Sequence, residues 1–270
     1  MKIDLKYPVL LVHGMGFRDD LPFAYWGRIP KVLEDAGVQV FFGNQDGLGS
    51  IEENAEIVKK AILETLDITG AEKVNIIAHS KGGLDSRYAI ANLGMAEKVA
   101  SLTTIATPHN GSKTVDFLLK LPDFIVRIVA VIGNLWYKRF GDKKPDCYRV
   151  FHSFKTENAV RFNQNTKDCE AVYYQSYASV MKNCTSDVFL WLPNLLVKWI
   201  EGENDGLLTP ESVKWGEYKG VIRSEGRRGV SHLDQIDLRR RPLVFVSGEK
   251  KTDILGFYTG LVRQLSDMGY

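Results

Sequence analysis

Ser80 is the residue of this sequence whose neighbours most clearly indicate chemistry. The apolar residues 74–78 are typical of a buried strand, Ser80 follows two positions later, and a helical pattern begins at Gly82. Small residues stand two positions before and two positions after the serine, at Ala78 and Gly82, where a strand and a helix would cross closely. This layout predicts a nucleophile elbow, with the Ser80 hydroxyl at the tip of a strained turn. The first helical amide, that of Lys81, would then point at a developing oxyanion.

A serine hydroxyl is a poor nucleophile at neutral pH, so it needs a base and an acid that orients the base. After an elbow of this kind the acid and the histidine follow the serine in that order along the chain. His152 and His232 lie far enough beyond the elbow, and we predict His232 as the base because it lies in a loop just before the last strand and helix. Asp205, in a tight Asn-Asp-Gly turn, is the predicted acid, and Glu201 and Glu203 are the alternatives.

A second oxyanion donor is expected from the loop after the first strand. That loop contains the sequence His13-Gly14-Met15, so we predict the backbone amide of Met15 as the donor. His13 and His109 lie in loops at the same edge of the predicted sheet and are expected to stabilise turns. His79 is expected to point away from Ser80 and to serve packing.

Strands and helices alternate in the first part of the chain. Apolar strands are predicted at residues 8–12, 38–42, 74–78 and 99–105, and helices at 26–36, 51–66 and 82–93. The sheet returns at 171–177 and 243–246, and an amphipathic helix over 254–265 ends the chain. This order predicts an α/β fold, with a mostly parallel central sheet and helices on both faces. We predict a single domain over residues 1–270.

The alternation breaks at residues 113–149, which we predict to be a helical lid or cap inserted into that domain. Residues 118–140 are strongly apolar, with apolar side chains at helical spacing. A cap of this kind would cover the carboxyl edge of the sheet, where α/β enzymes hold their sites. A second apolar run, residues 188–200, is predicted to flank the same pocket; a core helix is the alternative.

The composition narrows the class of protein. The 270 residues are 44% hydrophobic and 25% charged, with a net charge of +2, as in an ordinary soluble domain. The charge argues against a nucleic-acid partner. The 3 cysteines match neither a disulfide framework nor a zinc motif, and no stretch has the length and apolarity of a transmembrane segment. No signal peptide precedes the first strand, so we expect a cytoplasmic protein as the sequence stands, or a secreted one if a leader has been removed.

The motifs, taken in order, resemble those of the bacterial family I triacylglycerol lipases. The resemblance rests on residues 7–15, 25–30, 73–83, 106–112, 158–163, 185–189, 204–207 and 232–234. It covers nearly the whole chain, and it implies an α/β-hydrolase fold and lipase activity. It also implies Asp205 as the acid of the triad. Ala78 departs from the family's usual glycine.

The same resemblance implies a structural calcium ion beside the loop of His232. Its carboxylate ligands would be Asp187 and Asp234, with backbone carbonyls of Leu238 and Pro242 completing the shell. Oxygen-only ligation suits such a hard cation, which would fix the loop rather than take part in chemistry. The alternative is that Asp187 caps a helix and Asp234 is a loop carboxylate. No organic cofactor is expected.

These observations lead to an expected function of the EC 3.1.1 type. We expect a serine ester hydrolase that cleaves acylglycerols through an acyl-enzyme on Ser80, with transient contact between the lid and a lipid–water interface. A short- or medium-chain carboxylesterase, a phospholipase and an acyltransferase would use the same triad. A lipid-binding protein that kept the fold and lost the chemistry is the alternative from another class.

Overall fold

The structure is a computed structural model, and it describes residues 2–16, 18–19, 25–139, 141–241, 245–247 and 250–270. Its centre is one sheet with the strand order β2-β1-β3-β4-β5-β6-β7-β8. The strands are β1 (Val9–Val12), β2 (Val40–Phe42), β3 (Val74–His79), β4 (Val99–Ile105), β5 (Tyr173–Ser179), β6 (Glu217–Ser224), β7 (Phe245–Ser247) and β8 (Lys250–Thr252). All pairings from β2 to β6 are parallel, and β7 and β8 extend the sheet as antiparallel strands.

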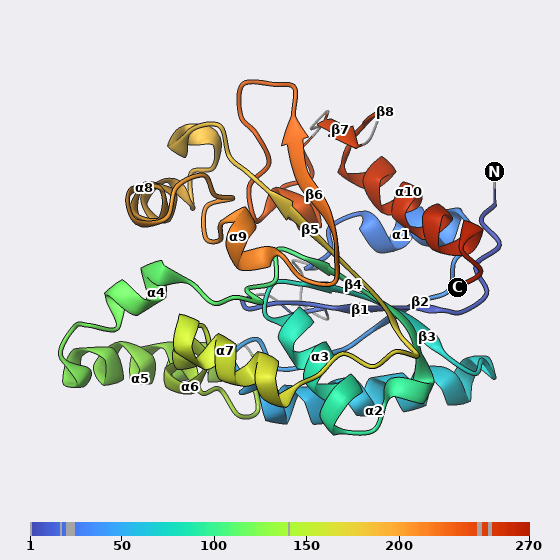
Figure 1. The fold of residues 1–270 in the computed structure, drawn as a ribbon, viewed down its shortest axis with the longest axis horizontal. Helices are drawn as coiled ribbons and strands as arrows, with labels where there is room; N and C mark the ends of the chain where they lie inside the picture. The colour runs from blue at the N-terminus through green and yellow to red at the C-terminus, as the bar shows by residue number, and fades with distance from the viewer. Residues whose placement is uncertain (1, 17, 20–24, 140, 242–244, 248–249) are drawn as a thin grey trace.

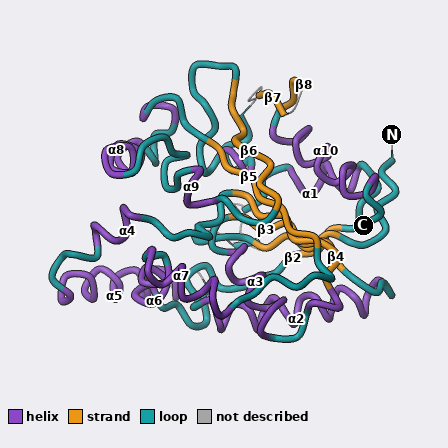
Figure 2. Tube along the Cα trace, in the orientation of Figure 1, coloured by secondary structure: helices purple, strands orange, loops and turns teal. Residues whose placement is uncertain are grey.

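Helices cover both faces of this sheet (Figure 1). The α-helices are α1 (Ile29–Asp35), α2 (Ile51–Thr69), α3 (Gly82–Asn92), α4 (Lys113–Leu118), α5 (Asp123–Arg139), α6 (Cys147–Ser153), α7 (Thr156–Asn165), α8 (Trp191–Ile200), α9 (Pro210–Val213) and α10 (Ile254–Asp267). Helices α1 and α10 pack on one face, and α2 and α3 on the other, as Figure 2 also shows. The α/β architecture that the alternating pattern predicted is therefore confirmed.

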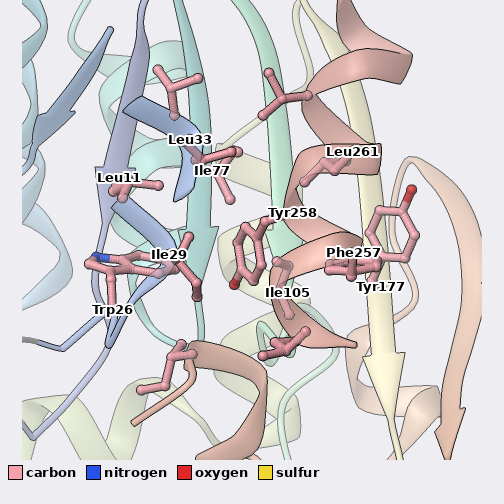
Figure 3. Close-up of a cluster of buried hydrophobic side chains, with 14 of the residues drawn as sticks. Leu11, Trp26, Ile29, Leu33, Ile77, Ile105, Tyr177, Phe257, Tyr258 and Leu261 are labelled. Carbon is pink, nitrogen blue, oxygen red and sulfur yellow. The ribbon is translucent and has the colours of Figure 1, made fainter. Parts of the chain in front are cut away.

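The two faces of each central strand contribute side chains to two separate hydrophobic cores, because side chains alternate along a strand. Leu11, Ile77 and Ile105 point toward α1 and α10, where they meet Trp26 and Tyr258 (Figure 3). The alternate residues of the same strands pack against α2 and α3 instead. Burial on both faces explains why these strands read as continuous apolar runs in the sequence.

Several predicted boundaries were wrong. The first helix begins at Ile29 rather than residue 26, because Pro30 stands in its first turn and Trp26 is buried in the core before the helix starts. The apolar run 118–140 is divided between two helices: α4 ends at Leu118 and α5 begins after Pro122. A proline disfavours helical backbone at the residue before it. Of the predicted strand 243–246, residues 243–244 lie outside the described part of the chain, as does Phe140.

The insertion predicted at residues 113–149 corresponds to α4, α5 and the start of α6, in the part of it that the structure describes. These helices project from the carboxyl edge of the sheet, and α8 lies at the same end of the molecule (Figure 1). None of the helices that the structure describes is long and apolar enough to cross a membrane.

Candidate active site

The turn after β3 has the strained geometry that an elbow requires. Ser80 has a φ of 52°, in the left-handed region that non-glycine residues rarely adopt. Its backbone is held from both sides, because its N–H donates to the carbonyl of Ile105 at 2.9 Å and its carbonyl accepts from Thr107 Oγ1 at 2.7 Å. The end of β4 therefore fixes the residue that we predict as the nucleophile.

Two glycines allow the elbow to touch the loop after β1. A Cβ added at Gly82 would lie 2.3 Å from the carbonyl oxygen of His13, and one added at Gly14 would lie 2.6 Å from Cβ of Ser80. These contacts bring the N-terminus of α3 against the loop that carries Met15. The first amides of a helix have no intrahelical partner. The predicted oxyanion donors, the amides of Lys81 and Met15, thus lie on two segments in direct contact.

Gly82→Ala tests this close approach. The new methyl group would have to displace backbone atoms, so we expect the free energy of unfolding to fall by about 1–3 kcal/mol and ester hydrolysis to fall with it. Gly260→Ala is the matched control, because Gly260 lies within α10 with nothing near its added Cβ. There we expect a gain of about 0.5–1 kcal/mol. Urea unfolding of both variants measures the difference. Equal stabilities would contradict the tight packing at the elbow.

His232 and Asp205 form a buried pair beside the elbow. Nδ1 of His232 lies 2.8 Å from Oδ2 of Asp205, and the backbone N–H of His232 donates to the Asp205 carbonyl at 2.7 Å. The other carboxylate oxygen accepts the amides of Leu207 and Leu208 at 3.0 and 2.9 Å. Gln235 Nε2 donates to Oδ2 at 2.9 Å. These bonds orient the carboxylate and the imidazole together.

The structure separates Asp205 from the two alternative acids. Glu203 lies on the surface, where it pairs with Arg223 at 3.0 Å. Glu201 accepts hydrogen bonds from Ser112 and Thr114 at the start of α4. Of the three carboxylates, Asp205 is the one placed against His232.

An apolar cavity of about 330 Å³ opens onto Ser80 and His232. Both residues line it, as do Met15 from the loop after β1, Val115 from α4 and Phe151 from α6. A mostly apolar cavity with a few convergent polar groups is the usual form of a small-molecule site. Ser80, His232 and Met15, predicted separately from the sequence, are thus brought to one cavity.

His79 is a site residue that the sequence reasoning missed. It was expected to point away from Ser80 and to serve packing, and it does pack against the rings of Tyr25 and Trp26. It is also among the residues that line the cavity, and its ring centroid lies 4.4 Å from that of His232. Its Nδ1 lies 2.7 Å from the hydroxyl of Tyr25. Burial, followed by the neighbouring charge of His232, holds the pKa of His79 well below its ordinary value. Both effects favour the neutral form of the His79 ring.

The remaining histidines make structural contacts. The His13 ring lies between the carbonyls of Gly14 and Gln45, at 2.7 and 2.9 Å. His109 stacks on Trp215 with the ring centroids 4.6 Å apart, and burial followed by the charge of Arg87 lowers its pKa well below the ordinary value. His152 packs on the ring of Tyr148 in the insertion.

Lys81 has two parts with different roles. Its backbone amide is a predicted oxyanion donor, and its side chain forms an ion pair. Its ammonium is buried and lies 2.6 and 2.9 Å from the two oxygens of Asp85, one turn along α3. Burial raises the pKa of Asp85, and the charge of Lys81 opposes that effect. The ammonium is therefore paired within its own helix.

The residues predicted to bind calcium lie on either side of Ser231. Asp187 Oδ2 accepts the Ser231 hydroxyl at 3.0 Å, and Asp234 Oδ2 accepts the Ser231 amide at 3.1 Å. Leu238 follows in the same loop, and Pro242 lies outside the described residues. The remaining oxygen of Asp187 accepts the amide of Phe189 at 2.9 Å and lies 3.1 Å from a guanidinium nitrogen of Arg239. Because both oxygens of Asp187 are engaged by Ser231, Phe189 and Arg239, the site does not fit a calcium ion. Among the described side chains, no group of three His, Cys, Asp or Glu residues has a metal-binding arrangement.

Comparisons with known proteins agree with this geometry. Residues 8–224 match the family model described as palmitoyl protein thioesterase. The chain is 32% identical over 265 residues to triacylglycerol lipase 2 of Saccharomyces cerevisiae, covering 93% of this chain and 76% of that protein. It is 33% identical over 268 residues to a triacylglycerol lipase of Pseudomonas fragi, covering 87% of this chain and 89% of the relative.

Solved structures give the same result for the fold. The mature form of the Bacillus licheniformis lipase BlEst2 has a TM-score of 0.67 at 19% identity, over 88% of this chain and 90% of that one. Lipase 1 from Pelosinus fermentans has a TM-score of 0.66 at 18% identity, over 97% and 99% of the two chains. The fold class predicted from the sequence is confirmed.

Proposed function

This chain belongs to the triacylglycerol lipase family of α/β-hydrolases, and we propose that it hydrolyses carboxylic esters of acylglycerols through an acyl-enzyme on Ser80. The observation that carries the proposal is the buried pair of His232 and Asp205, with 2.8 Å between Nδ1 and Oδ2, in the cavity that Ser80 lines. The same three residue types in this order form the triad of α/β-hydrolases.

In the first half of the reaction, Ser80 Oγ attacks the ester carbonyl carbon while His232 Nε2 takes the hydroxyl proton. The carbonyl oxygen becomes an oxyanion, which the amides of Met15 and Lys81 stabilise. The intermediate then collapses: the bond to the alcohol oxygen breaks, His232 returns the proton to that oxygen, and the alcohol leaves. The acyl group remains as an ester on Ser80.

In the second half, His232 takes a proton from water, and the hydroxide attacks the acyl carbon. The bond to Ser80 Oγ breaks, the proton returns to that oxygen, and the fatty acid leaves. Asp205 keeps the Nδ1–H of His232 in place throughout and stabilises the imidazolium that forms in each half.

Exposed apolar side chains on helices at the carboxyl edge of the sheet support a lipid substrate. Helix α5 exposes Phe124, Ile128, Val131, Ile132, Leu135 and Trp136, and α8 exposes Trp191, Leu192, Leu195 and Trp199. Phe117 of α4 meets Trp199 edge to face, with 5.7 Å between ring centroids, so α4 packs directly against α8. Trp199 is 73% exposed, which argues against the alternative that residues 188–200 are a core helix. We propose that this α5/α8 surface contacts the lipid–water interface and that α4 and α5 act as the lid.

Ile132→Asp tests both the substrate class and the interface. A charge on α5 should not enter a lipid surface, so we expect hydrolysis of emulsified trioctanoin to fall roughly tenfold or more. Hydrolysis of dissolved p-nitrophenyl butyrate should change little, since that ester needs no interface. Titration of released acid and of p-nitrophenolate measures the two rates, and wild type should cleave both substrates.

Ile68→Asp is the matched control for this substitution. Ile68 is 71% exposed, against 62% for Ile132, but it lies near the C-terminus of α2, at the opposite edge of the sheet (Figure 1). Its substitution should leave both rates unchanged. An equal loss in both variants, or no loss in Ile132→Asp, would contradict the interface. Trp191 and Trp199 fluorescence should also shift when lipid vesicles are added.

Substrate comparison separates lipase activity from the other uses of this triad. A carboxylesterase would cleave dissolved short-chain esters and leave emulsified triacylglycerol intact. A phospholipase would prefer phosphatidylcholine vesicles, and an acyltransferase would give a new ester when an alcohol is added. The family model matched over residues 8–224 favours one further comparison, a palmitoyl thioester. A folded wild-type protein that cleaves none of these substrates would contradict the proposed function.

A further inference from the structure

Ser231, the residue before His232, makes one of the attachments between the loop of His232 and the rest of the protein. The Ser231 hydroxyl donates to Asp187 Oδ2 at 3.0 Å, and the Ser231 amide donates to Asp234 Oδ2 at 3.1 Å. Asp187 lies far away in the sequence, between β5 and α8, and is fully buried. The position of His232 therefore depends on Asp187 staying in place.

A cation from the same loop holds Asp187. Nη2 of Arg239 lies 3.1 Å from Asp187 Oδ1, and the side chains of Arg239 and Asp187 are only 9% and 0% exposed. The guanidinium lies over the ring of Phe189, with 4.9 Å between Cζ and the ring centroid. Contact with both Asp187 and Phe189 holds the guanidinium in one orientation, as expected for a planar, weakly hydrated cation.

The charges around Ser231 are already balanced. Asp187 and Asp234 contribute two carboxylates, Arg239 pairs with the first, and Arg228 donates from Nε to the carbonyl of Ser186 at 3.1 Å. A calcium ion here would bring two further positive charges beside two guanidinium groups. It would also need six to eight oxygen ligands, whereas both Asp187 oxygens already accept hydrogen bonds.

We propose that the Arg239 guanidinium does in this chain what a divalent cation would do, and that the loop of His232 is held without calcium. Arg239 is a positioning residue: it acts on Asp187, which holds Ser231, which precedes the base. This inference rests on the proposed role of His232 as the base. If it holds, the protein is a lipase that does not need calcium, because the Arg239 side chain takes the place of the metal that the resemblance implied.

The first test uses the wild-type protein. The protein is stripped of metal with EDTA, and the EDTA is then removed. Calcium titrated into this protein should give no binding heat. Neither added EDTA nor millimolar calcium should shift the melting temperature. Hydrolysis of p-nitrophenyl butyrate should be equal in EDTA and in calcium. Stoichiometric calcium binding, with loss of melting temperature in EDTA, would overturn the inference whatever the activity.

The second test removes the guanidinium. Arg239→Ala leaves Asp187 buried without its partner, so we expect kcat/KM to fall roughly 10–100-fold, as for other residues that orient a functional group from behind. The variant should now bind calcium at Asp187 and Asp234, and calcium should restore part of its activity and melting temperature. Arg239→Lys should retain more activity than Arg239→Ala. The exposed Arg241, altered to Ala, is the matched control and should behave as wild type.

The outcomes separate this inference from the proposed function. Arg239→Ala with wild-type activity and melting temperature would overturn the role of Arg239. A loss that calcium does not relieve would overturn its equivalence to a metal; adding Asp187→Asn should abolish any calcium response that is seen. If Arg239→Ala does not fold, the wild-type calorimetry and Arg239→Lys still decide the question. A wild type without esterase activity that also binds no calcium would contradict the proposed function and leave the metal-free loop standing.

Discussion

Replacing Ser80 by alanine should lower kcat/KM for ester hydrolysis at least about 10⁴-fold and leave the protein folded. Without Oγ no acyl-enzyme can form, and the residual rate would come from binding and oxyanion stabilisation alone. An alanine at φ 52° has the same backbone cost as the serine, so the melting temperature should change little. The rates of p-nitrophenyl butyrate hydrolysis, with the circular dichroism of each variant, measure this directly.

Ser86→Ala is the matched control for the nucleophile. Ser86 is buried and lies in the helix that follows the elbow, where its hydroxyl donates to the carbonyl of Gly82 at 2.8 Å. It does not line the cavity. Its variant should keep most of the wild-type rate. If Ser80→Ala remained active, or both variants lost activity equally, Ser80 would not be the nucleophile.

Asp205→Asn should lower kcat by about 10⁴-fold near neutral pH. The asparagine amide cannot compensate the imidazolium of His232. Its NH₂ group would meet the Leu207 and Leu208 amides on one side or Gln235 Nε2 on the other. It could donate to His232 Nδ1 only in the tautomer protonated at Nε2, which cannot take the proton from Ser80. Oδ1 of Asp205 now accepts the Leu207 and Leu208 amides, and Oδ2 accepts from Gln235 and lies against His232 Nδ1. A donor placed among donors is left unsatisfied, so some stability should be lost as well.

Glu203→Gln is the matched control for the acid. Glu203 stands two residues from Asp205 but lies on the surface with Arg223. Exposed ion pairs contribute little to stability, and Glu203 does not line the cavity. We expect wild-type kinetics and melting temperature. A loss of activity in Glu203→Gln together with an active Asp205→Asn would show that Glu203, and not Asp205, is the acid.

The sequence allowed prediction of the elements that are buried on both faces. Strands β1, β3 and β4 read as apolar runs because α1 and α10 cover one side of them and α2 and α3 the other. The elbow was predictable because its requirements are local: a strand, two small residues and a helix within a few positions of Ser80. Motif order pointed to His232, and the family resemblance favoured Asp205 over Glu201 and Glu203. The structure brings these two residues into contact, although neither is local to the serine.

Strand β6 was missed because its sequence does not look buried. Glu217–Ser224 is largely polar and half-exposed, and Gly220 has a φ of 98°, where the register with β5 shifts. An irregular strand of this kind lacks both the apolar run and the regular alternation used to predict strands. It forms because β5 offers an unpaired edge, and that edge exists only in the folded sheet.

The contacts around the base depended on tertiary structure in the same way. His79 reaches His232 only because the chain reverses at Ser80 and the loop after β6 returns over it. Arg239 meets Asp187 across two loops that no local pattern connects. The arginine stood in a basic stretch that is typical of solvated surface, and nothing in its neighbours indicated burial beside a carboxylate.

Covalent trapping tests the central claim most directly. A p-nitrophenyl alkylphosphonate should phosphonylate Ser80, releasing one equivalent of p-nitrophenolate as activity is lost, and peptide mass spectrometry should place the adduct on that residue alone. His232→Ala should react far more slowly, because no base takes the proton from Oγ. An adduct on another residue, or full inhibition with Ser80 unmodified, would contradict the proposed triad.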